Sequence, residues 1–551
     1  MQKLQIFVYK SPRGSGLGLV RHPEHLAELG LGAALVTSPL SSSQAYEQLA
    51  IWKRRLRGPA ARLWPLLARG FHRPHLQLAG SPLEESERVL ARIRQVLTGR
   101  IIPEHRLLHL LRAEGYWPSQ VGRALDLGVF RGEIVQLPGF RNEAWGVKRC
   151  SRCGSANAQP FPCRNCGSLE CLLCLECSTL GEHRACSTLL AVGGSDSAPE
   201  RQRVELVLNV ELTTAQRQAS RELLDFWERR QGKALVWAAC GAGKTEVAFA
   251  LIQRALEEGH EVLFAIPRLD IVREMVQRLR SSFPGLEIAA HHGGQPWFAP
   301  GRLVVATTHQ VLHFYRRFGL VVLDEVDAFP FQGSEMLRFG LLRALAPGGQ
   351  LVEMTATPAG PRPERVITIP ARHHGFPLPE PELVVDRLPP WPGLQAKGLP
   401  AVVVDALGEK ERPWLVFAPT IAACTALQGA LAEALSRRVG LCHAQLPTRA
   451  QVIEDFRRGD LDILVTTSVL ERGVNFPGIG VMVLYADHEL FSVSALVQMA
   501  GRVGRTAQEP TGPVLFVASR AAPAMHQAVR LIRELNQEAR RRGLLTGEAS
   551  A

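Results

Sequence analysis

Segment 238–245 constrains the fold of this chain more than any other stretch. It reads A-A-C-G-A-G-K-T, the pattern of a phosphate-binding loop (P-loop) with Ala in place of the usual first Gly. The apolar run 234–237 precedes it and the helical pattern 246–257 follows it, so the loop would connect a buried strand to a helix. Gly241 and Gly243 would let the backbone wrap an anion, and a helix N-terminus favours negative charge. The segment therefore predicts a site for the phosphates of a nucleotide.

The polar residues that such a site needs follow in the sequence. Lys244 would reach the β- and γ-phosphates of ATP, and the hydroxyl of Thr245 would ligate Mg2+. Further on, the apolar run 319–323 ends in Asp324 and Glu325. A carboxylate at the carboxyl end of a buried parallel strand lies where nucleotides bind. We therefore expect Asp324 to hold the magnesium ion and Glu325 to activate the attacking water.

Strand and helix patterns alternate around these motifs. The apolar runs 262–266, 303–306 and 351–354 each suit a buried strand, and a helical pattern follows the first of them. This alternation is typical of a doubly wound parallel sheet. We therefore predict an α/β fold, with a first domain over residues 205–372.

Residues 373–551 repeat the alternation without a second P-loop. The runs 414–418, 463–465 and 481–484 suit strands, and the pattern Q-x-x-G-R-x-G-R follows at 498–505. Arg502 and Arg505 would project guanidinium groups that match phosphate geometry. Because the P-loop lies in the other domain, these arginines are expected to act as arginine fingers that complete an ATP site between two domains.

The length and the net charge of the whole chain narrow the class of protein. The chain has 551 residues, enough for several domains, and a net charge of +12, which favours a polyanionic partner: nucleic acid first and an anionic membrane surface second. No apolar run reaches the length that spans a bilayer, and the N-terminus lacks the layout of a signal peptide. We therefore expect a cytoplasmic protein.

Residues 1–145 carry no catalytic signature and are predicted to form a basic, mostly α-helical accessory domain. Lys and Arg outnumber Asp and Glu there by 20 to 11. Segments 84–97 and 104–112 have helical spacing of apolar residues. Segment 115–125 has a Gly-containing turn before a helical pattern, so a helix-turn-helix motif is an alternative to a plain helical domain.

Eight of the 11 cysteines fall within residues 146–190, which predicts a structural zinc module rather than disulfides. They are Cys150, Cys153, Cys163, Cys166, Cys171, Cys174, Cys177 and Cys186. One possible scheme joins the first four of them in one zinc site. Another interleaves them in two sites, with the pairs 150/153 and 171/174 on one zinc ion and the other four on a second. His183 could replace one of the last two cysteines. Residues 191–204, rich in Gly, Ser, Pro and charge, are predicted to be a linker.

Together these motifs resemble those of superfamily 2 helicases. They occur in the expected order over residues 212–518: G-A-G-K-T, I-P-R at 266–268, D-E-V-D at 324–327, T-A-T at 355–357, V-F-A-P-T at 416–420, T-T-S-V-L-E-R-G-V-N-F-P at 466–477, and Q-x-x-G-R-x-G-R. The resemblance implies two RecA-like domains, hydrolysis of ATP with Mg2+, and movement along nucleic acid.

A narrower resemblance is to the ComFA family of late-competence DNA-uptake ATPases. It is carried by the cysteine-rich module upstream of the first RecA-like domain, by D-E-V-D-A-F-P at 324–330 and by L-E-R-G-V at 470–474. It implies translocation on single-stranded DNA, with duplex DNA possible, during DNA import. It also implies competence partners such as ComFC and the membrane channel, with a position at the inner face of the cell membrane.

Two other functions stay open. One is a replication-restart or repair helicase that resembles PriA, whose acidic motif looks like D-E-E-H and whose zinc region interrupts the helicase part. The other is a zinc-bearing nucleic-acid-binding protein without motor activity. RNA also stays open as the polymer, because backbone contacts separate it from DNA only where a 2′-hydroxyl is read.

The helicase resemblance implies further site residues. Gln216, in the L-T-x-x-Q stretch, would contact adenine, and Gly473 would lie in the nucleotide site. Thr355 and Thr357 would couple that site to the bound strand. The residues expected to hold the single-strand backbone lie at strand ends: Arg268, Thr308, Thr420 and Thr467.

Two aromatic residues in the D-E-V-D-A-F-P-F segment have two possible roles. Phe329 and Phe331 could stack on bases, or they could pack against the core. We favour packing, because aromatic side chains mostly serve burial.

Overall fold

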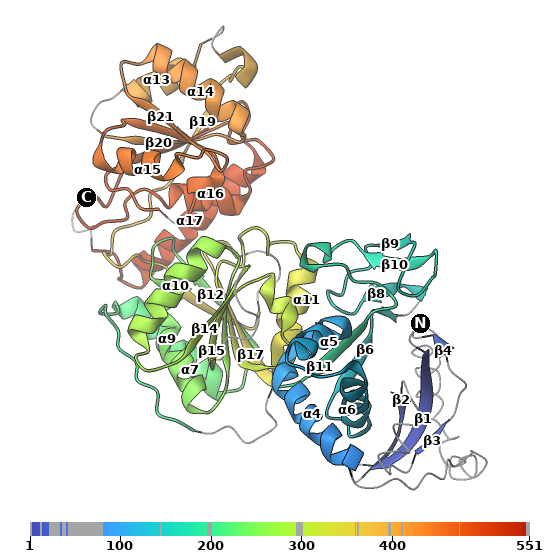
Figure 1. Cartoon of the computed structure of the whole chain (residues 1–551). Coiled ribbons are helices and arrows are strands. Elements are labelled where there is room, and N and C mark those ends of the chain that lie inside the picture. Colours follow the sequence, from blue (N-terminus) through green and yellow to red (C-terminus); the bar gives the residue numbers. More distant parts are fainter. Residues whose placement is uncertain are drawn as a thin grey trace.

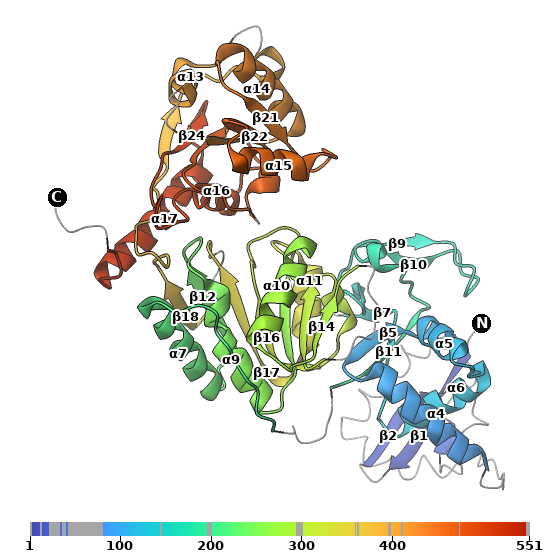
Figure 2. The same ribbon diagram turned by 60° about the vertical axis from the view of Figure 1, so that its left-hand side comes forward.

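The structure is a computed structural model that describes residues 3–11, 14–20, 33–35, 40–41, 81–143, 146–194, 201–293, 301–358, 360, 363–394, 398–408, 412–472 and 474–546. Two sheet domains make up most of it. In Figures 1 and 2 the second sheet domain (orange to red) lies above the first (green to yellow). The blue and teal N-terminal regions lie beside the first sheet domain in both views.

The first sheet domain contains a seven-stranded parallel sheet, in the order β14-β15-β13-β16-β17-β12-β18. Its strands are β12 (Lys233–Ala238), β13 (Val262–Ile266), β14 (Ile288–His291), β15 (Leu303–Thr307), β16 (Phe318–Leu323), β17 (Leu345–Thr355) and β18 (Arg365–Ile369). Its helices are α7 (Thr214–Glu228), α8 (Lys244–Val247), α9 (Phe249–Glu257), α10 (Leu269–Ser282) and α11 (Glu335–Ala344), with the 3-10 turn η5 (Gln310–His313). Strands β13 and β16 are buried along their whole length, as expected where helices cover both faces of a parallel sheet.

The second sheet domain contains a six-stranded parallel sheet, in the order β19-β24-β23-β20-β22-β21. Its strands are β19 (Glu382–Val385), β20 (Trp414–Phe417), β21 (Val439–Cys442), β22 (Ile463–Thr466), β23 (Gly480–Leu484) and β24 (Val514–Ala518). Its helices are α13 (Ala401–Gly408), α14 (Ile421–Ala434), α15 (Arg449–Arg458), α16 (Val493–Ala500) and α17 (Pro523–Arg541), with the 3-10 turns η6 (Trp391–Gly393) and η7 (Ser468–Leu470). The prediction of two RecA-like, doubly wound parallel sheets is therefore confirmed.

The N-terminal region combines helices with small antiparallel sheets. The predicted helices are present as α4 (Ser81–Leu97), α5 (Glu104–Ala113) and α6 (Pro118–Phe130). The strands of this region were not predicted, and they include β1 (Lys3–Ser11), β2 (Gly14–Val20), β3 (Ala33–Leu35) and β4 (Leu40–Ser41). Helix α6 packs closely on α4 and buries seven of its residues, including Val121, Leu125 and Phe130. The helix-turn-helix alternative for this segment stays a prediction.

The cysteine module grows out of this N-terminal region. Its strands are β7 (Phe140–Asn142), β8 (Lys148–Cys150), β9 (Ala158–Phe161) and β10 (Cys171–Cys174), with the 3-10 turn η4 (Ser178–Leu180). After the last cysteine, β11 (Thr188–Val192) returns to pair with β5 (Arg100–Pro103) and β6 (Val135–Pro138). Ala191 and Val192 therefore lie in a sheet, although they fall in the predicted linker. Ala191 is buried like the three residues before it, and the irregular segment begins after Val192.

The two sheet domains share one continuous hydrophobic cluster, which includes Cys240 from the first domain and Val497 and Val503 from the second. This contact brings the loop after β12 next to the end of α16. Over the described part of the chain, none of the helices combines the length and the apolar character needed to cross a bilayer.

Candidate functional site

The P-loop connects β12 to α8, as the sequence predicted. Ala238 is the last residue of β12 and pairs with Ile369, so the Ala that replaces the usual first Gly sits in extended backbone. Gly241 and Gly243 have φ angles of +81° and +65°, a region that favours glycine. A Cβ atom on Gly243 would lie 2.4 Å from Nε2 of Gln216. Glycine at that position avoids both the backbone strain and the contact with Gln216.

Gln216 lies beside the P-loop on α7. Its Nε2 donates a 2.9 Å hydrogen bond to the carbonyl oxygen of Ala242, and its Oε1 accepts a 2.7 Å hydrogen bond from the backbone N–H of Thr213. In the structure Gln216 therefore ties the first helix of the domain to the loop. Its expected contact with adenine stays a prediction.

Lys244 and Asp324 form an ion pair in the interior of the site. Nζ of Lys244 lies 2.8 Å from Oδ1 of Asp324. Burial by itself would lower the pKa of Lys244, but the carboxylates of Asp324, Glu325 and Asp327 raise it to about 12. The ammonium group is therefore charged at neutral pH, and it is held at the carboxyl end of β16. The hydroxyl-bearing Thr245 next to it is buried.

Asp327, the last residue of D-E-V-D, joins three segments. Its carboxylate accepts a 2.7 Å hydrogen bond from Oγ1 of Thr355 and a 2.9 Å bond from Oγ1 of Thr357. It also accepts a 2.9 Å bond from Nη2 of Arg472 and a bond from Oγ of Ser494, both in the second sheet domain. Four donors on one buried carboxylate make a firm connection between the domains.

Arg472 extends this connection to Glu325. Its Nη1 lies 3.1 Å from Oε2 of Glu325, and its side chain is buried. Glu325, the expected base, is therefore paired with a cation in this arrangement, and its backbone has a φ of +54°. No role for Arg472, Asp327 or Ser494 was predicted from the sequence. Asp327 and Arg472 lie in the D-E-V-D and L-E-R-G-V strings, whereas no sequence motif marks Ser494.

A pocket lies between the two sheet domains and is lined by both. The first domain contributes the P-loop with Lys244 and Thr245, together with Asp324 and Glu325. The second contributes Arg472, Gln498, Arg502 and Arg505. The structure therefore brings the predicted ATP-site residues of the two domains together around one space.

The two predicted arginine fingers are largely enclosed. Arg502 is 3% exposed and donates a hydrogen bond from Nη1 to the carbonyl oxygen of Val474, while Nε of Arg505 donates a 2.9 Å bond to that of Gly501. Within the described residues, Nε of Arg502 is buried without an acceptor. Burial lowers the pKa of Arg502, and the nearby charge of Arg505 lowers it further. Buried cations with unsatisfied donors fit a polyanion such as a nucleotide phosphate chain.

The remaining predicted residues lie at strand ends. Thr308 directly follows β15 and Thr467 directly follows β22; Arg268 and Thr420 are the N-caps of α10 and α14. All four follow parallel strands at their carboxyl ends, and the hydroxyl of Thr308 is buried with no partner among the described residues. Their role as contacts to a nucleic-acid backbone stays a prediction. Gly473 lies outside the described residues.

The two aromatic residues after D-E-V-D differ from each other. Phe331 is 7% exposed and packs in the cluster that contains Leu337 and Leu341 of α11, which confirms the packing interpretation for this residue. Phe329 is 85% exposed, so the packing interpretation is wrong for it. In this segment Ala328 and Phe331 are the buried residues.

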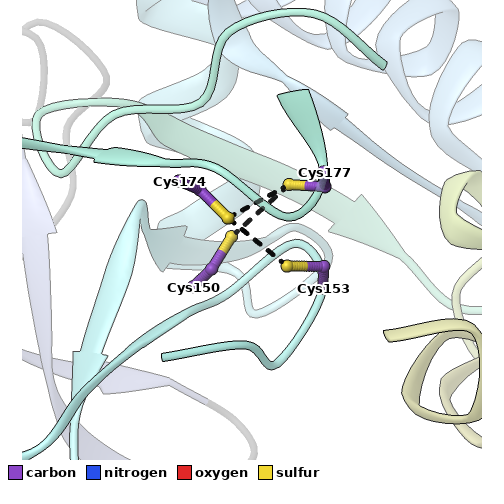
Figure 3. A group of neighbouring side chains, drawn as sticks. All are labelled: Cys150, Cys153, Cys174 and Cys177. Carbon is purple, nitrogen blue, oxygen red and sulfur yellow. Dashed lines mark hydrogen bonds between the residues drawn. The ribbon is translucent and has the colours of Figure 1, made fainter. Parts of the chain in front are cut away.

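The eight cysteines gather in two sets of four. The first set is Cys150, Cys153, Cys174 and Cys177, and the second is Cys163, Cys166, Cys171 and Cys186; within each set all sulfur atoms lie within 4.8 Å of one another. Figure 3 shows the thiols of the first set pointing toward one another from two turns of the chain. Four convergent thiols at this spacing fit a tetrahedral zinc ion.

Both pairing schemes drawn from the sequence are wrong. Cys171 and Cys174 are three residues apart in β10, and residues separated by an odd number in a strand face opposite sides. They therefore belong to different sets, and the pair that completes the first set is Cys174 and Cys177. His183 joins neither set, since its Nε2 lies 3.0 Å from the carbonyl oxygen of Gly139.

Comparisons with known proteins match three parts of the chain. Residues 91–191 match the competence protein ComFA N-terminal domain, residues 209–360 match the type III restriction enzyme res subunit, and residues 399–507 match the helicase conserved C-terminal domain. The first match extends across residue 145, the predicted boundary between the N-terminal domain and the cysteine module. The strand pairs β7–β8 and β11–β5 also join residues on the two sides of this boundary. The domain boundaries themselves stay predictions.

Individual relatives cover most of the chain. Competence protein ComFA of Bacillus subtilis (strain 168) is 33% identical over 409 residues, which cover 71% of this chain and 86% of the relative. Competence protein ComFA of Streptococcus pneumoniae (strain ATCC BAA-255 / R6) is 33% identical over 419 residues, covering 73% and 94%. ATP-dependent DNA helicase RecG of Streptococcus pneumoniae serotype 4 is 28% identical over 340 residues, covering 55% of this chain and 48% of the relative.

Proposed function

The chain belongs to the ComFA family of competence proteins, and from that premise we propose that it uses ATP to move single-stranded DNA during DNA import. It is an ATP-hydrolysing DNA helicase or translocase, as its two helicase-type domains indicate. The observation that carries the proposal is the pocket lined by the P-loop of one domain and by Arg502 and Arg505 of the other. Such a site can couple hydrolysis to relative movement of the domains, because nucleotide binding holds them together.

In this proposal each residue of the pocket has one task in hydrolysis. The P-loop backbone and Lys244 hold the β- and γ-phosphates, while Thr245 and Asp324 hold Mg2+. Glu325 orients the attacking water and takes its proton, and Arg502 and Arg505 stabilise the charge on the transferred group. Bound Mg·ATP supplies the phosphoryl group and a cation that spreads its negative charge.

The ion pairs of the described structure suggest how these residues are held before ATP binds. Lys244 pairs with Asp324, and Arg472 pairs with Glu325. Lys244 must exchange Asp324 for phosphate oxygens, which leaves Asp324 to hold the magnesium ion. Glu325 must leave Arg472 before it can accept a proton from water. Occupation of the site therefore requires both ion pairs to rearrange.

We assign the strand-holding role to the carboxyl ends of the parallel strands. Arg268 and Thr308 lie there in the first sheet domain, and Thr420 and Thr467 lie there in the second. Contacts from two domains to one sugar–phosphate backbone would be tolerant of sequence and sensitive to salt. Alternate closing and opening of the ATP cleft would change the spacing of these contacts and advance the strand.

We propose that each set of four cysteines holds one structural zinc ion. The support is the residue type, the count of four and the convergence within 4.8 Å. We further propose that the protein works with competence partners such as ComFC and the membrane channel, at the inner face of the cell membrane. A net charge of +12 fits an anionic surface as well as DNA.

The experiment that tests this function is the ATPase rate with single-stranded DNA, duplex DNA, forked DNA or RNA, at low and high salt. We expect single-stranded DNA to stimulate hydrolysis most, with stimulation that falls as salt rises. Lys244→Ala should abolish turnover and leave DNA binding largely intact. Stimulation only by forks or duplex would favour a restart helicase instead. Stimulation by no polymer would contradict the motor assignment.

A further inference from the structure

Arg372 lies in the connection between the two sheet domains, three residues after the end of β18. No role for this residue was predicted from the sequence. Its side chain is 2% exposed. On the side of the first domain, its Nε donates a 2.9 Å hydrogen bond to the carbonyl oxygen of Cys240 in the P-loop. The guanidinium group is therefore fixed to the phosphate-binding loop.

The same guanidinium group also binds the turn that carries the arginine fingers. Nη1 of Arg372 donates a 2.7 Å hydrogen bond to the carbonyl oxygen of Val503 and another to that of Gly504. Nη2 donates a 3.1 Å hydrogen bond to the carbonyl oxygen of Gly501. These three acceptors lie immediately around Arg502 and before Arg505. One side chain thus connects the P-loop to the arginine turn, residues 501–505.

Glycines at this contact let the two backbones approach each other. A Cβ atom on Gly501 would lie 2.5 Å from Cβ of Cys240. Gly504 has a φ of +66°, and a Cβ atom on it would lie 3.2 Å from Nη1 of Arg372 and 2.1 Å from the carbonyl oxygen of Pro510. Glycine at these two positions therefore permits the close contact with Cys240 and leaves room for the guanidinium group of Arg372.

The electrostatics of Arg372 do not suit a role in stability alone. Over the described residues, no carboxylate forms an ion pair with it, and its acceptors are backbone carbonyls. Burial lowers the pKa of Arg372 to about 10, with a further contribution from Arg505, so the group stays charged at neutral pH. A buried cation without a counter-ion is costly to fold, and an apolar side chain could fill the same space at lower cost. Arg372 does not line the pocket itself.

We propose that Arg372 is a positioning residue that holds the arginine turn in register with the P-loop, so that Arg502 and Arg505 face the phosphates. This inference rests on the proposed function of those two arginines. Arg372 acts through them and touches no phosphate. Because it lies on the connection between the domains, a change in their relative orientation changes which carbonyls its guanidinium group can reach. Its contacts therefore link the orientation of the domains to the geometry of the site.

The test compares Arg372→Gln with wild-type protein in DNA-stimulated ATP hydrolysis. Because misplaced catalytic groups cost rate rather than ground-state binding, kcat should fall by about 100-fold while KM for ATP changes little. Arg387→Gln is the matched control, since Arg387 lies just after β19 in the second sheet domain and is exposed. The control should keep the wild-type rate. Thermal unfolding of each variant shows whether the fold is retained.

Two further measurements separate positioning from a structural role. If Arg372 acts through Arg502, then adding Arg372→Gln to Arg502→Gln should lower kcat little beyond the single Arg502→Gln change. In Arg372→Ala, free methylguanidine should restore part of kcat, because it can fill the space between the same carbonyls. Arg372→Lys keeps the charge but not the fork of donors, so it should restore only a small part.

Several outcomes would overturn the inference. They are a wild-type kcat in Arg372→Gln, fully additive effects with Arg502→Gln, or a rise in KM without a fall in kcat. If Arg372→Gln does not fold, the absence of rescue by methylguanidine and by Arg372→Lys would overturn it. If the wild-type protein hydrolyses ATP and Lys244→Ala does not, any of these results contradicts only the role of Arg372. If Lys244→Ala hydrolyses ATP normally, the proposed function itself fails.

Discussion

Arg343 of α11 donates a 2.7 Å hydrogen bond to the carbonyl oxygen of Arg152, which lies between Cys150 and Cys153. It donates another, of 3.0 Å, to the carbonyl oxygen of Ser151. The guanidinium group of Arg152 in turn donates two 3.1 Å bonds to Sγ of Cys177. Helix α11 is therefore connected through two arginines to a sulfur atom of the first cysteine set. The cysteine module is therefore attached to the first sheet domain through this helix.

We predict that Arg343→Met loosens the cysteine module from the first sheet domain. The change leaves the carbonyl oxygens of Ser151 and Arg152 without their charged donor, which should cost about 2 kcal/mol in the free energy of unfolding. Denaturant unfolding, followed by tryptophan fluorescence, measures this loss. Arg338→Met is the control, because Arg338 is exposed on the same helix. Equal stability of the two variants would contradict the prediction.

The two cysteine sets should differ in what metal removal does. Cys153, in the first set, packs in one hydrophobic cluster with Leu312 and Leu337 of the first sheet domain. Cys166, in the second set, is half-buried and is not a member of that cluster. We therefore expect Cys153→Ser to lower the melting temperature of the first sheet domain far more than Cys166→Ser. Each variant should lose one zinc ion, as measured by metal analysis.

A chelator should reproduce the difference between the two sets in wild-type protein. Loss of a closed four-thiolate site removes folding free energy, so unfolding should become easier in proportion to how far the site supports the domain. Equal effects of Cys153→Ser and Cys166→Ser on the melting temperature would show that the first set does not stabilise the first sheet domain more than the second set does.

The pair between Asp327 and Arg472 predicts a dependence of stability on pH. Burial by itself would raise the pKa of Asp327, but Arg472 and Lys244 lower it below its ordinary value of 3.8. A carboxyl group with a lowered pKa contributes stability that is fully present above its unfolded pKa and is lost as the pH falls below it. Arg472→Met should therefore cost roughly 3 kcal/mol or more at neutral pH, since it leaves a buried charge unpaired.

The cost of Arg472→Met should shrink as the pH is lowered from about 5 to about 3, because the unpaired Asp327 of the variant then takes up a proton, whereas the paired carboxylate of the wild-type protein, whose pKa is lowered, stays charged. Denaturant midpoints of wild-type protein and variant across this range measure the change. Asp327→Asn serves as the control, because it removes the titrating group and should flatten the dependence. A cost that is the same at every pH would show that the ion pair does not stabilise the contact between the domains.

Phe329 and Phe331 should respond differently to truncation. Phe329 is 85% exposed, so Phe329→Ala should leave stability unchanged. If its ring stacks on a base, the variant should bind single-stranded DNA more weakly by about 1–3 kcal/mol. Phe331→Ala should cost about 3–5 kcal/mol in stability, because it opens a cavity in the core. Fluorescence anisotropy with a labelled oligonucleotide decides the first point, and unchanged affinity would exclude stacking by Phe329.

The motifs that sequence analysis located are those that local backbone chemistry encodes. Gly241 and Gly243 have the positive φ angles that the loop requires, and the apolar runs of β13 and β16 are buried throughout. The sequence pattern of a buried parallel strand followed by a polar turn can be recognised without knowing which strands lie beside it. For this reason the two doubly wound sheets could be predicted from the sequence, together with the candidate site residues at the carboxyl ends of their strands.

The pairing of the cysteines could not be found in this way. Cys171, Cys174 and Cys177 have two overlapping C-x-x-C spacings, and the sequence does not say which of them is a turn. The structure places Cys171 and Cys174 at the two ends of β10, on opposite faces of the strand. The spacing therefore allowed a metal-binding pair that the strand geometry excludes.

The residues that connect the two domains were missed for a different reason. Arg472 lies 145 positions from Asp327, and Arg372 lies 132 positions from Cys240. Each is one of many arginines in the sequence, and its role becomes evident only from the residues that it contacts in the structure. Local sequence patterns do not reveal such contacts, because the contacts depend on how the two sheet domains face each other.

The central claim is that ATP hydrolysis at the shared pocket drives movement along single-stranded DNA. The most direct test is displacement of streptavidin from the biotinylated end of a single-stranded oligonucleotide, with wild-type protein and with Glu325→Gln. That variant keeps Lys244 and Thr245 for nucleotide binding but lacks the expected base. The account predicts rapid displacement by wild-type protein with ATP, and none by Glu325→Gln. Displacement at equal rates by both proteins, or hydrolysis by wild-type protein without displacement, would contradict it.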